Sequence, residues 1–269
     1  MKVAASMITL NQKRGWQERL PESLAALTER LILAANVAPY NPSTLRLAKR
    51  PWAVRMSEFG EMMQPGTFAG LGERKLFMNE QVLKAIHRGA TQVLVVGAGF
   101  DTLCLRLAPP FPGVRFVEVD HPATAAAKRK GVEQEGQPGN MTMIAVDLGE
   151  ASLSSALADC QDWDPDAQSV VVAEGLLLYL SADAVLALFR EVDISTGAHS
   201  RVVFSHLVDF RRHGLARAVL RWYREPWLSS SRRQNLPTYV GPGWDIVATG
   251  AGRPRRDLEG FAVAKKSAN

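Results

Sequence analysis

The segment that decides the fold is QVLVVGAGFDTLCLRL, which spans residues 92–107. It begins with a run of apolar, mostly β-branched residues, which is typical of a strand buried on both faces in a parallel sheet. The run ends at Gly97, Ala98 and Gly99, where two glycines permit a tight turn and the close approach of a ligand to the backbone. A helix is expected from about Asp101. A strand, a glycine turn and a helix N-terminus in this order indicate a ligand-binding corner of an open α/β sheet.

The glycine turn carries only part of the fingerprint that binds dinucleotides. That fingerprint is G-x-G-x-x-G, and Thr102 stands at its third glycine position here. An NAD-dependent oxidoreductase is therefore a less favoured hypothesis. A tight strand-to-helix turn that binds nothing is the structural alternative for this segment taken by itself.

A second apolar segment, VRFVEVD at residues 114–120, ends in an acidic residue. An acid about twenty residues after such a turn commonly accepts hydrogen bonds from the hydroxyl groups of a ribose. Asp120 at the end of the segment is the preferred candidate, and Glu118 within it is the weaker one. The alternative is that either acid is simply solvated at the end of a strand.

Four motifs then occur in the order and spacing of one enzyme family: GAGFDT, FVEVDHP, an Asp-Leu pair at residues 147–148, and AEGLLLYL. Over residues 72–180 the chain resembles the leucine carboxyl methyltransferase-like family of S-adenosylmethionine-dependent enzymes. The resemblance implies an α/β fold of the Rossmann-like class I methyltransferases, with a mostly parallel seven-stranded sheet, a terminal antiparallel hairpin and a helical cap. It also implies S-adenosyl-L-methionine as the cofactor and O-methylation as the reaction. A non-catalytic cofactor-binding or regulatory protein that kept the fold is the main alternative.

The expected domain organisation follows from where the strand pattern occurs. Residues 1–72 lack it and are expected to form an N-terminal helical cap over the carboxyl edge of the sheet. Residues 73–269 are expected to form the methyltransferase domain, with a lid insert at about 208–241. The remaining strands are predicted at residues 141–146, 169–173 and 201–207, and the hairpin at 244–249 and 260–265.

The resemblance also implies a set of cofactor-binding residues at the ends of successive strands: Arg74, Gly97, Ala98, Gly99, Asp120, His121, Asp147, Leu148 and Glu174. Arg74 is expected to pair with the methionine carboxylate, because a guanidinium is always charged and binds a carboxylate bidentately. Asp147 is expected to accept a hydrogen bond from the adenine amino group, while the backbone N–H of Leu148 reaches a ring nitrogen. Glu174 is expected to pair with the cofactor's ammonium group, and its rival role is that of general base.

Structural alternatives stay open for two of these residues, since Arg74 could be a surface arginine and Asp147 a cap or turn residue. The sequence also departs from the family pattern at two places. The family motif Arg-Thr followed by Asp-Asp is replaced by Arg74-Lys75 followed by residues 79–80, Asn-Glu, and Leu103 stands where bacterial members often have arginine.

Three residues are candidates for catalysis: His206, Asp209 and Tyr179. His206 ends the predicted strand 201–207, and a histidine there is expected to face the crevice, where it could deprotonate a hydroxyl acceptor. A structural role is the alternative for His206, and Tyr179 lies either on the pocket floor or in the core. A carboxylate acceptor is already ionised and needs no base.

Composition narrows the class of protein further. The chain has 269 residues, of which 46% are hydrophobic and 22% charged, as in an ordinary globular protein. No apolar run reaches the roughly 18 residues of a membrane span, and the N-terminus does not resemble a signal peptide. The two cysteines indicate neither a disulfide framework nor a metal cluster. A cytoplasmic protein without a membrane partner is expected.

The net charge of +5 is concentrated near the C-terminus, where ten arginines and three acids lie between residues 207 and 256. A solvated basic face and a nucleic-acid surface are two interpretations of this cluster. No DNA- or RNA-binding motif accompanies it, so no nucleic-acid partner is expected. An anionic small molecule or peptide, drawn in by one or two arginines, is the preferred acceptor.

Overall fold

The structure is a computed structural model, and it describes residues 23–36, 50–52, 55, 62, 69–208, 228–251 and 259–267. Its centre is a seven-stranded sheet in the order β3-β2-β1-β4-β5-β7-β6. The strands are β1 (Gln92–Val96), β2 (Arg115–Asp120), β3 (Met141–Ala145), β4 (Ser169–Ala173), β5 (Arg201–Leu207), β6 (Trp244–Ala251) and β7 (Glu259–Lys266). β1 to β5 are parallel, and β7 is antiparallel to both of its neighbours. The predicted fold class, including the terminal hairpin, is confirmed.

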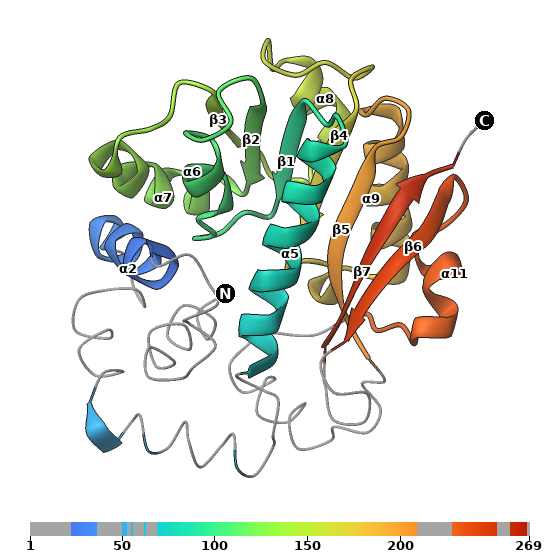
Figure 1. The fold of residues 1–269 in the computed structure, drawn as a ribbon, viewed down its shortest axis with the longest axis horizontal. Coiled ribbons are helices and arrows are strands. Elements are labelled where there is room, and N and C mark those ends of the chain that lie inside the picture. Colours follow the sequence, from blue (N-terminus) through green and yellow to red (C-terminus); the bar gives the residue numbers. More distant parts are fainter. Residues whose placement is uncertain are drawn as a thin grey trace.

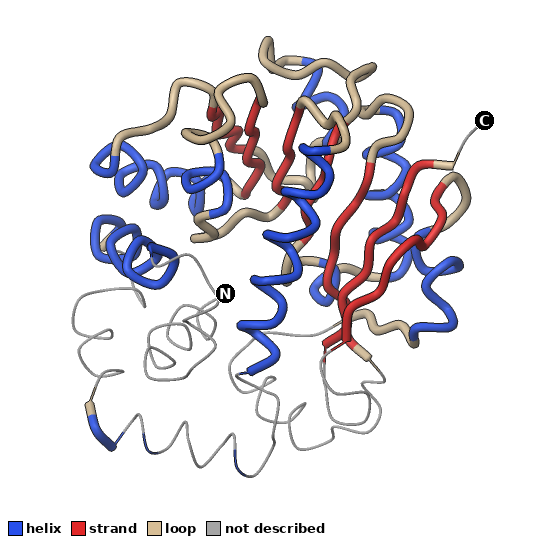
Figure 2. Tube along the Cα trace, viewed as in Figure 1, coloured by secondary structure: helices blue, strands red, loops and turns tan. Residues whose placement is uncertain are grey.

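Helices cover both faces of the sheet and give three layers (Figure 1, Figure 2). One face carries α2 (Ser23–Ala35), α5 (Ala69–His87), α6 (Leu103–Leu107) and α7 (Pro122–Glu135). The other face carries α8 (Leu153–Ala158), α9 (Ala182–Ile194) and α11 (Leu236–Val240). Short 3-10 turns occur at η2 (Leu177–Tyr179) and η4 (Arg233–Asn235).

The central strands are buried on both faces, as their apolar composition predicts. All five residues of β1 and all five of β4 are buried. Successive side chains of a strand point to opposite faces. Val93 and Val95 therefore belong to the core under α5, and Leu94 and Val96 to the core under α9. Both faces of β1 are thus covered, which leaves its carboxyl end as the place where a ligand can approach.

Helix α5 begins at Ala69, so it crosses the domain boundary expected at residue 72. It packs against β4, β5 and β7 and runs across the front of the sheet in Figure 1. A helix that leads into a parallel strand runs antiparallel to it. The first turns of α5 therefore lie beside the carboxyl ends of the strands, and Arg74 reaches that edge.

Helix α2, the part of the expected cap that the structure describes at length, lies against α7 and not across the strand ends. Gly131 of α7 makes this contact possible, because a Cβ atom at that position would lie 2.8 Å from the Cα atom of Leu31. Arg30 binds Glu135 bidentately, at 2.6 and 2.8 Å. The remainder of the cap falls almost wholly outside the described residues. Residues 209–227 of the expected lid also lie outside them.

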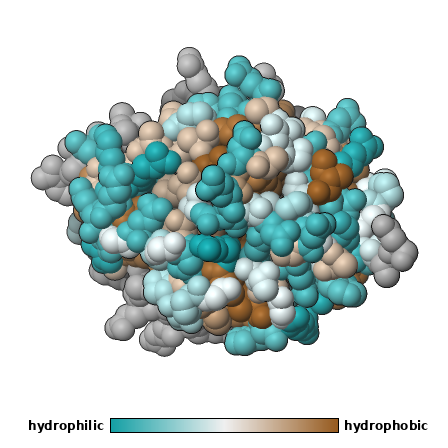
Figure 3. Space-filling view, turned by 90° about the horizontal axis from the view of Figure 1, so that it is seen from above, coloured by the Kyte–Doolittle hydropathy of each residue, from teal (hydrophilic) through white to brown (hydrophobic). Residues whose placement is uncertain are grey.

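The visible surface is mainly hydrophilic, with small apolar areas scattered between polar ones on the face shown in Figure 3. None of the helices in the described ranges is long and apolar enough to cross a membrane.

The close contact between α2 and α7 gives a test of this packing. Gly131→Val should destabilise the protein by about 2 kcal/mol, because the new side chain overlaps the backbone of Leu31. Thermal unfolding should show a fall of roughly 4–8 °C. Gly139→Val is the matched control, since a Cβ atom there meets nothing within 4 Å. An unchanged melting temperature for Gly131→Val would contradict the packing of α2 on α7.

Candidate active site

The glycine turn after β1 has the backbone conformation that requires glycine. Gly97 and Gly99 have φ angles of 66° and 51°, in the left-handed region that other residues rarely adopt. A Cβ atom on Gly97 would also lie 2.9 Å from the side chain of Leu176. The N–H groups of Gly97 and Ala98 donate to the carbonyl of Val119, at 2.8 and 3.3 Å, so the turn is fastened to the end of β2.

Asp120 holds the same turn from the tip of β2. Its carboxylate accepts hydrogen bonds from the N–H of Gly99 and, at 2.6 Å, from the N–H of His121. A small cavity lies beside these atoms, lined in part by Gly99, Asp120 and Ile144. Each carboxylate oxygen can accept a further hydrogen bond. The predicted ribose-binding residue therefore holds the glycine turn in place, beside a cavity with room for about one water molecule.

Glu118, the weaker candidate, lies deeper and is already paired. It is 2% exposed and accepts a hydrogen bond from Lys128 of α7 at 2.5 Å. Burial raises the pKa of Glu118 despite the nearby ammonium of Lys128. Burial also raises the pKa of the neighbouring Cys104 thiol, which agrees with its expected place in the core. The two acids of β2 therefore differ in depth, and Asp120 is the one at the strand end.

His121 and Asp147 lie beside each other at the ends of β2 and β3. The Nδ1 atom of His121 accepts a hydrogen bond from Ala123 and thereby caps α7, so the proton of a neutral ring is on Nε2. Nε2 is 3.5 Å from the Asp147 carboxylate, which also accepts from the N–H of Gly149 at 2.9 Å. Leu148 is 37% exposed. Asp147 thus makes the turn predicted as its structural alternative, while its side chain remains 43% exposed and accessible to a ligand.

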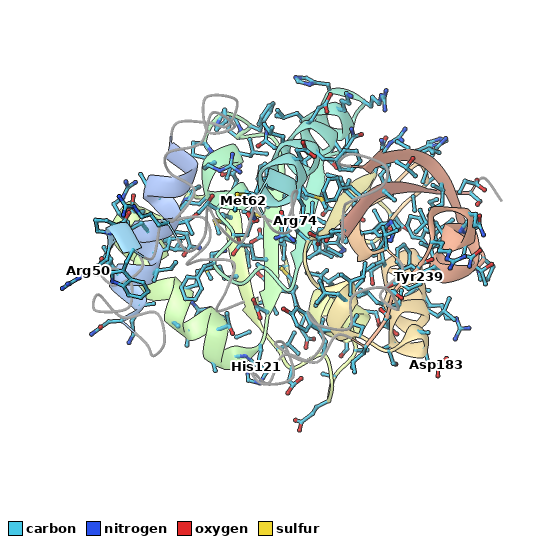
Figure 4. All side chains as sticks on the ribbon, turned by 90° about the horizontal axis from the view of Figure 1, so that it is seen from below. Arg50, Met62, Arg74, His121, Asp183 and Tyr239 are labelled. Carbon is cyan, nitrogen blue, oxygen red and sulfur yellow. The ribbon has the colours of Figure 1, made fainter. Side chains whose placement is uncertain are left out.

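Five charged side chains meet at the ends of β1, β4 and β7, and are called the charged cluster: Arg74, Lys75, Asp101, Glu174 and Glu259. Arg74 donates to Glu174 at 2.8 Å and to both oxygens of Glu259, at 2.8 and 2.7 Å. Lys75 binds Asp101 and lies 2.8 Å from Glu174. Figure 4, seen from below, shows Arg74 near the middle of the view. Arg74 is 8% exposed, so it is a buried arginine and not a surface one.

In the charged cluster, ion pairing shifts the pKa values of Arg74 and Asp101 more than burial does. Burial alone would lower the pKa of Arg74, but the carboxylates of Glu259 and Glu174 raise it above its usual value. Burial alone would raise the pKa of Asp101, but Lys75 holds it well below its usual range. Arg74 and Asp101 are therefore charged at neutral pH.

One oxygen of the cluster has no partner among the described residues. This is Oε2 of Glu174, in a side chain that is 6% exposed. An unsatisfied buried polar group costs about 1–3 kcal/mol, and more when it is charged. The oxygen lies at the end of β4, next to β1, where the order of the sheet reverses and α/β proteins bind their ligands. A cationic ligand group at this point would satisfy it.

The structure does not bring His206 into this cluster. Its side chain is 2% exposed, and its ring packs 6.2 Å from Phe204 and 6.4 Å from Tyr239, centroid to centroid. Nδ1 is 3.3 Å from the carbonyl of Leu207, and burial lowers the pKa of the ring. The opposite face of β5 carries Ser205, which accepts a hydrogen bond from the N–H of Gly175. His206 was expected to face the crevice. In the structure its ring is buried among aromatic side chains instead.

Tyr179 ends η2 and is half-buried, and Asp209 lies outside the described residues. Three members of the charged cluster were absent from the predicted site: Lys75, Asp101 and Glu259. Lys75 and Asp101 lie inside motifs that the sequence already marks. Glu259 is 185 positions from Arg74, and no sequence signal connects the two.

The fold and the glycine turn define the Rossmann-like class of methyltransferase folds, and comparison with known proteins gives the family. The model of the leucine carboxyl methyltransferase family matches residues 17–193, and the chain belongs to that family.

Relatives among named proteins agree with this assignment. A protein of Mycobacterium bovis (strain BCG / Pasteur 1173P2), named "Putative S-adenosyl-L-methionine-dependent methyltransferase", is 33% identical over 181 residues, which are 62% of this chain and 57% of that protein. A protein of the same name from Mycobacterium sp. (strain KMS) is 30% identical over 218 residues, 74% of this chain and 65% of that protein. The chain thus spans less than two thirds of the length of either relative.

Solved structures share the fold. A DUF574 family protein from Streptomyces avermitilis superposes with a TM-score of 0.63 at 15% identity, covering 89% of this chain and 97% of that one. The magnesium protoporphyrin IX methyltransferase of Synechocystis PCC 6803, solved with bound SAH, gives a TM-score of 0.53 at 14% identity, over 73% of this chain and 84% of that one.

The pairing of Asp101 predicts how stability depends on pH. A carboxyl group whose pKa is lowered by folding stabilises the protein above its unfolded pKa of about 3.9, and this contribution is lost as the pH falls below that value. Asp101→Asn should cost about 3 kcal/mol at pH 7, because Lys75 loses a buried partner.

Urea unfolding at pH 7 and pH 3.5 measures this difference, which should be smaller at the lower pH. Asp166→Asn, at an exposed carboxylate, is the control and should change stability by less than about 0.5 kcal/mol. A difference between wild type and Asp101→Asn that is equal at both values of pH would contradict the assignment.

Proposed function

We propose that the protein is an S-adenosylmethionine-dependent O-methyltransferase that acts on a small molecule or peptide. The preferred acceptor group is a carboxylate, and a hydroxyl group is the alternative. The support comes from the family, from the fold, and from four strand ends that present Gly97, Asp120, Asp147 and Glu174 along one edge of the sheet.

The observation that carries the proposal is the unpaired oxygen of Glu174 beside the guanidinium of Arg74. The amino-acid end of S-adenosylmethionine bears one ammonium and one carboxylate group. An unsatisfied carboxylate oxygen next to a buried guanidinium is complementary to that pair of charges. The glycine turn lets the nucleoside approach the backbone, Asp120 supplies a hydrogen-bond acceptor, and Asp147 is open to the adenine amino group.

Bound S-adenosylmethionine supplies a methyl group on a sulfonium, and the sulfur departs without a negative charge. The chain's residues then have to hold the acceptor in line with that methyl group and exclude water. Such positioning can contribute effective molarities of ~10⁵–10⁸ M. Apart from Arg74 on α5, the proposed cofactor contacts lie at or just after the ends of strands, which favours a fixed orientation.

The placement of His206 favours an acceptor that is already ionised. A ring that is 2% exposed and packed between aromatic side chains is poorly placed as a general base, and its pKa is lowered by burial. A carboxylate acceptor needs no base at neutral pH. We propose that a cation orients it, and the arginine-rich segment between residues 207 and 256 is the source that the sequence offers.

Ligand binding tests the cofactor assignment directly. S-adenosylhomocysteine should raise the melting temperature, because a ligand that binds only the native state stabilises it; at 100 times its dissociation constant the gain is about 2.7 kcal/mol. NADH should produce no shift. Transfer of a labelled methyl group to a panel of carboxylic acids and alcohols then distinguishes the two acceptor classes. Binding without transfer to any member would favour the non-catalytic alternative.

Two substitutions test the location of the pocket. Asp120→Ala and Gly97→Val should each weaken binding of S-adenosylhomocysteine at least about a hundredfold, since the first removes a ribose acceptor and a support of the turn, and the second fills the turn. Isothermal titration calorimetry measures the affinity, and circular dichroism checks the fold. Asp166→Ala is the control. Undiminished affinity in a folded variant would place the pocket elsewhere.

A further inference from the structure

Glu259 is a carboxylate that binds Arg74 although neither the family motifs nor the glycine turn assigns it a role. It is the first residue of β7, and its two oxygens lie 2.8 and 2.7 Å from the same nitrogen, Nη1. Its side chain is 15% exposed. The Arg74 guanidinium therefore already carries two carboxylates, one of them placed as a ligand's carboxylate would be.

The two carboxylates differ in how they are held. Glu174 is bound by Arg74 and also by Lys75 at 2.8 Å, so it remains anchored if one contact is lost. Within the described part of the chain, the ion pair with Arg74 is the only one that Glu259 makes. Glu259 also lies at the end of its strand, where a change of side-chain rotamer leaves the pairing of β7 with β5 intact. Glu259 is thus the carboxylate that can move away from Arg74 by a change of side-chain rotamer.

We propose that Glu259 is an internal competitor for the carboxylate of the cofactor. It occupies Arg74 in the cofactor-free protein and leaves Nη1 when the methionine carboxylate arrives, while Glu174 stays to bind the ammonium. This inference rests on the proposed function, because it assumes that S-adenosylmethionine binds at the charged cluster.

The physical reason is repulsion between like charges. A third carboxylate brought to a guanidinium that already holds two is repelled by both, in a site where little water is present to screen them. Displacement of Glu259 removes one of these repulsions but breaks a bidentate ion pair. Glu259 therefore lowers affinity for ligands with an amino-acid carboxylate, and it has no such effect on ligands without one.

Calorimetric titration with two ligands tests this selectivity. S-adenosylhomocysteine carries the amino-acid end, and 5′-methylthioadenosine has the same nucleoside thioether without it. Glu259→Gln keeps the size of the side chain and removes its charge. It should bind S-adenosylhomocysteine about tenfold more tightly than the wild type does and bind 5′-methylthioadenosine equally well. Its melting temperature without ligand should fall, because Arg74 loses a partner.

Two further variants keep the test independent of folding. Glu259→Asp retains the charge on a shorter side chain and should give an intermediate gain in affinity, because it reaches Arg74 less well. Glu135→Gln is the matched control, since it breaks another bidentate ion pair, with Arg30, away from the charged cluster. It should leave both affinities unchanged.

The outcomes separate the two proposals. Binding of S-adenosylhomocysteine to the wild type with an equal or weaker affinity in both Glu259 variants overturns the role of Glu259 and leaves the proposed function standing. An equal gain for both ligands also overturns it. Failure of S-adenosylhomocysteine to bind to the wild type and to every variant overturns the proposed function and the inference together.

Discussion

The arrangement of the candidate site depends on the burial of one guanidinium between two carboxylates. Arg74 joins α5 to the end of β4 through Glu174 and to the start of β7 through Glu259. Taking charges out of water is costly, and a buried ion pair contributes little net stability unless its geometry is good. The geometry of these ion pairs specifies how three distant segments meet. Loss of either carboxylate would leave the buried Arg74 guanidinium with one ion-pair partner fewer. The cluster thus joins the first turns of α5 to the ends of β4 and β7, while the pairing of β7 with β5 sets the position of the hairpin.

Depth along a strand decides what each acid at this edge can do. Phe116, Glu118 and Asp120 share one face of β2, since side chains alternate along a strand. Glu118 lies under α7 and needs Lys128 as a buried partner, whereas Asp120 at the tip accepts backbone N–H groups and still borders a cavity. On β5 it is the face of the strand, and not depth, that separates Ser205 from His206: Ser205 meets the N–H of Gly175, and His206 packs against Tyr239. The side chains that can contact a ligand at this edge are therefore those at strand ends, on the same face as the glycine turn.

Much of the fold could be predicted because its signals are local. Residues 169–173 and 201–207 form strands with the predicted bounds, since apolar runs between polar residues mark a strand buried on both faces. The start of α5 was predicted less well, because Gly70 and Gly72 are poor helix formers by propensity, yet they lie within the helix. The sequence also did not indicate that α2 packs on α7. Its apolar face predicts burial, but only the absence of a side chain at Gly131 shows that α7 is the surface it packs on.

The sequence by itself determined the class of fold, the glycine turn and the acids at the ends of the strands, because parallel strands end at a common edge and each motif contains its own turn signal. It also determined the family, through the order of four short motifs. Tertiary structure decided which of the charged side chains at the strand ends form ion pairs with one another. The contact between Arg74 and Glu259 spans 185 positions and arises only when β7 pairs with β5, so no local pattern encodes it. The burial of His206 has the same origin, since Tyr239 of α11 packs against its ring on that face of β5.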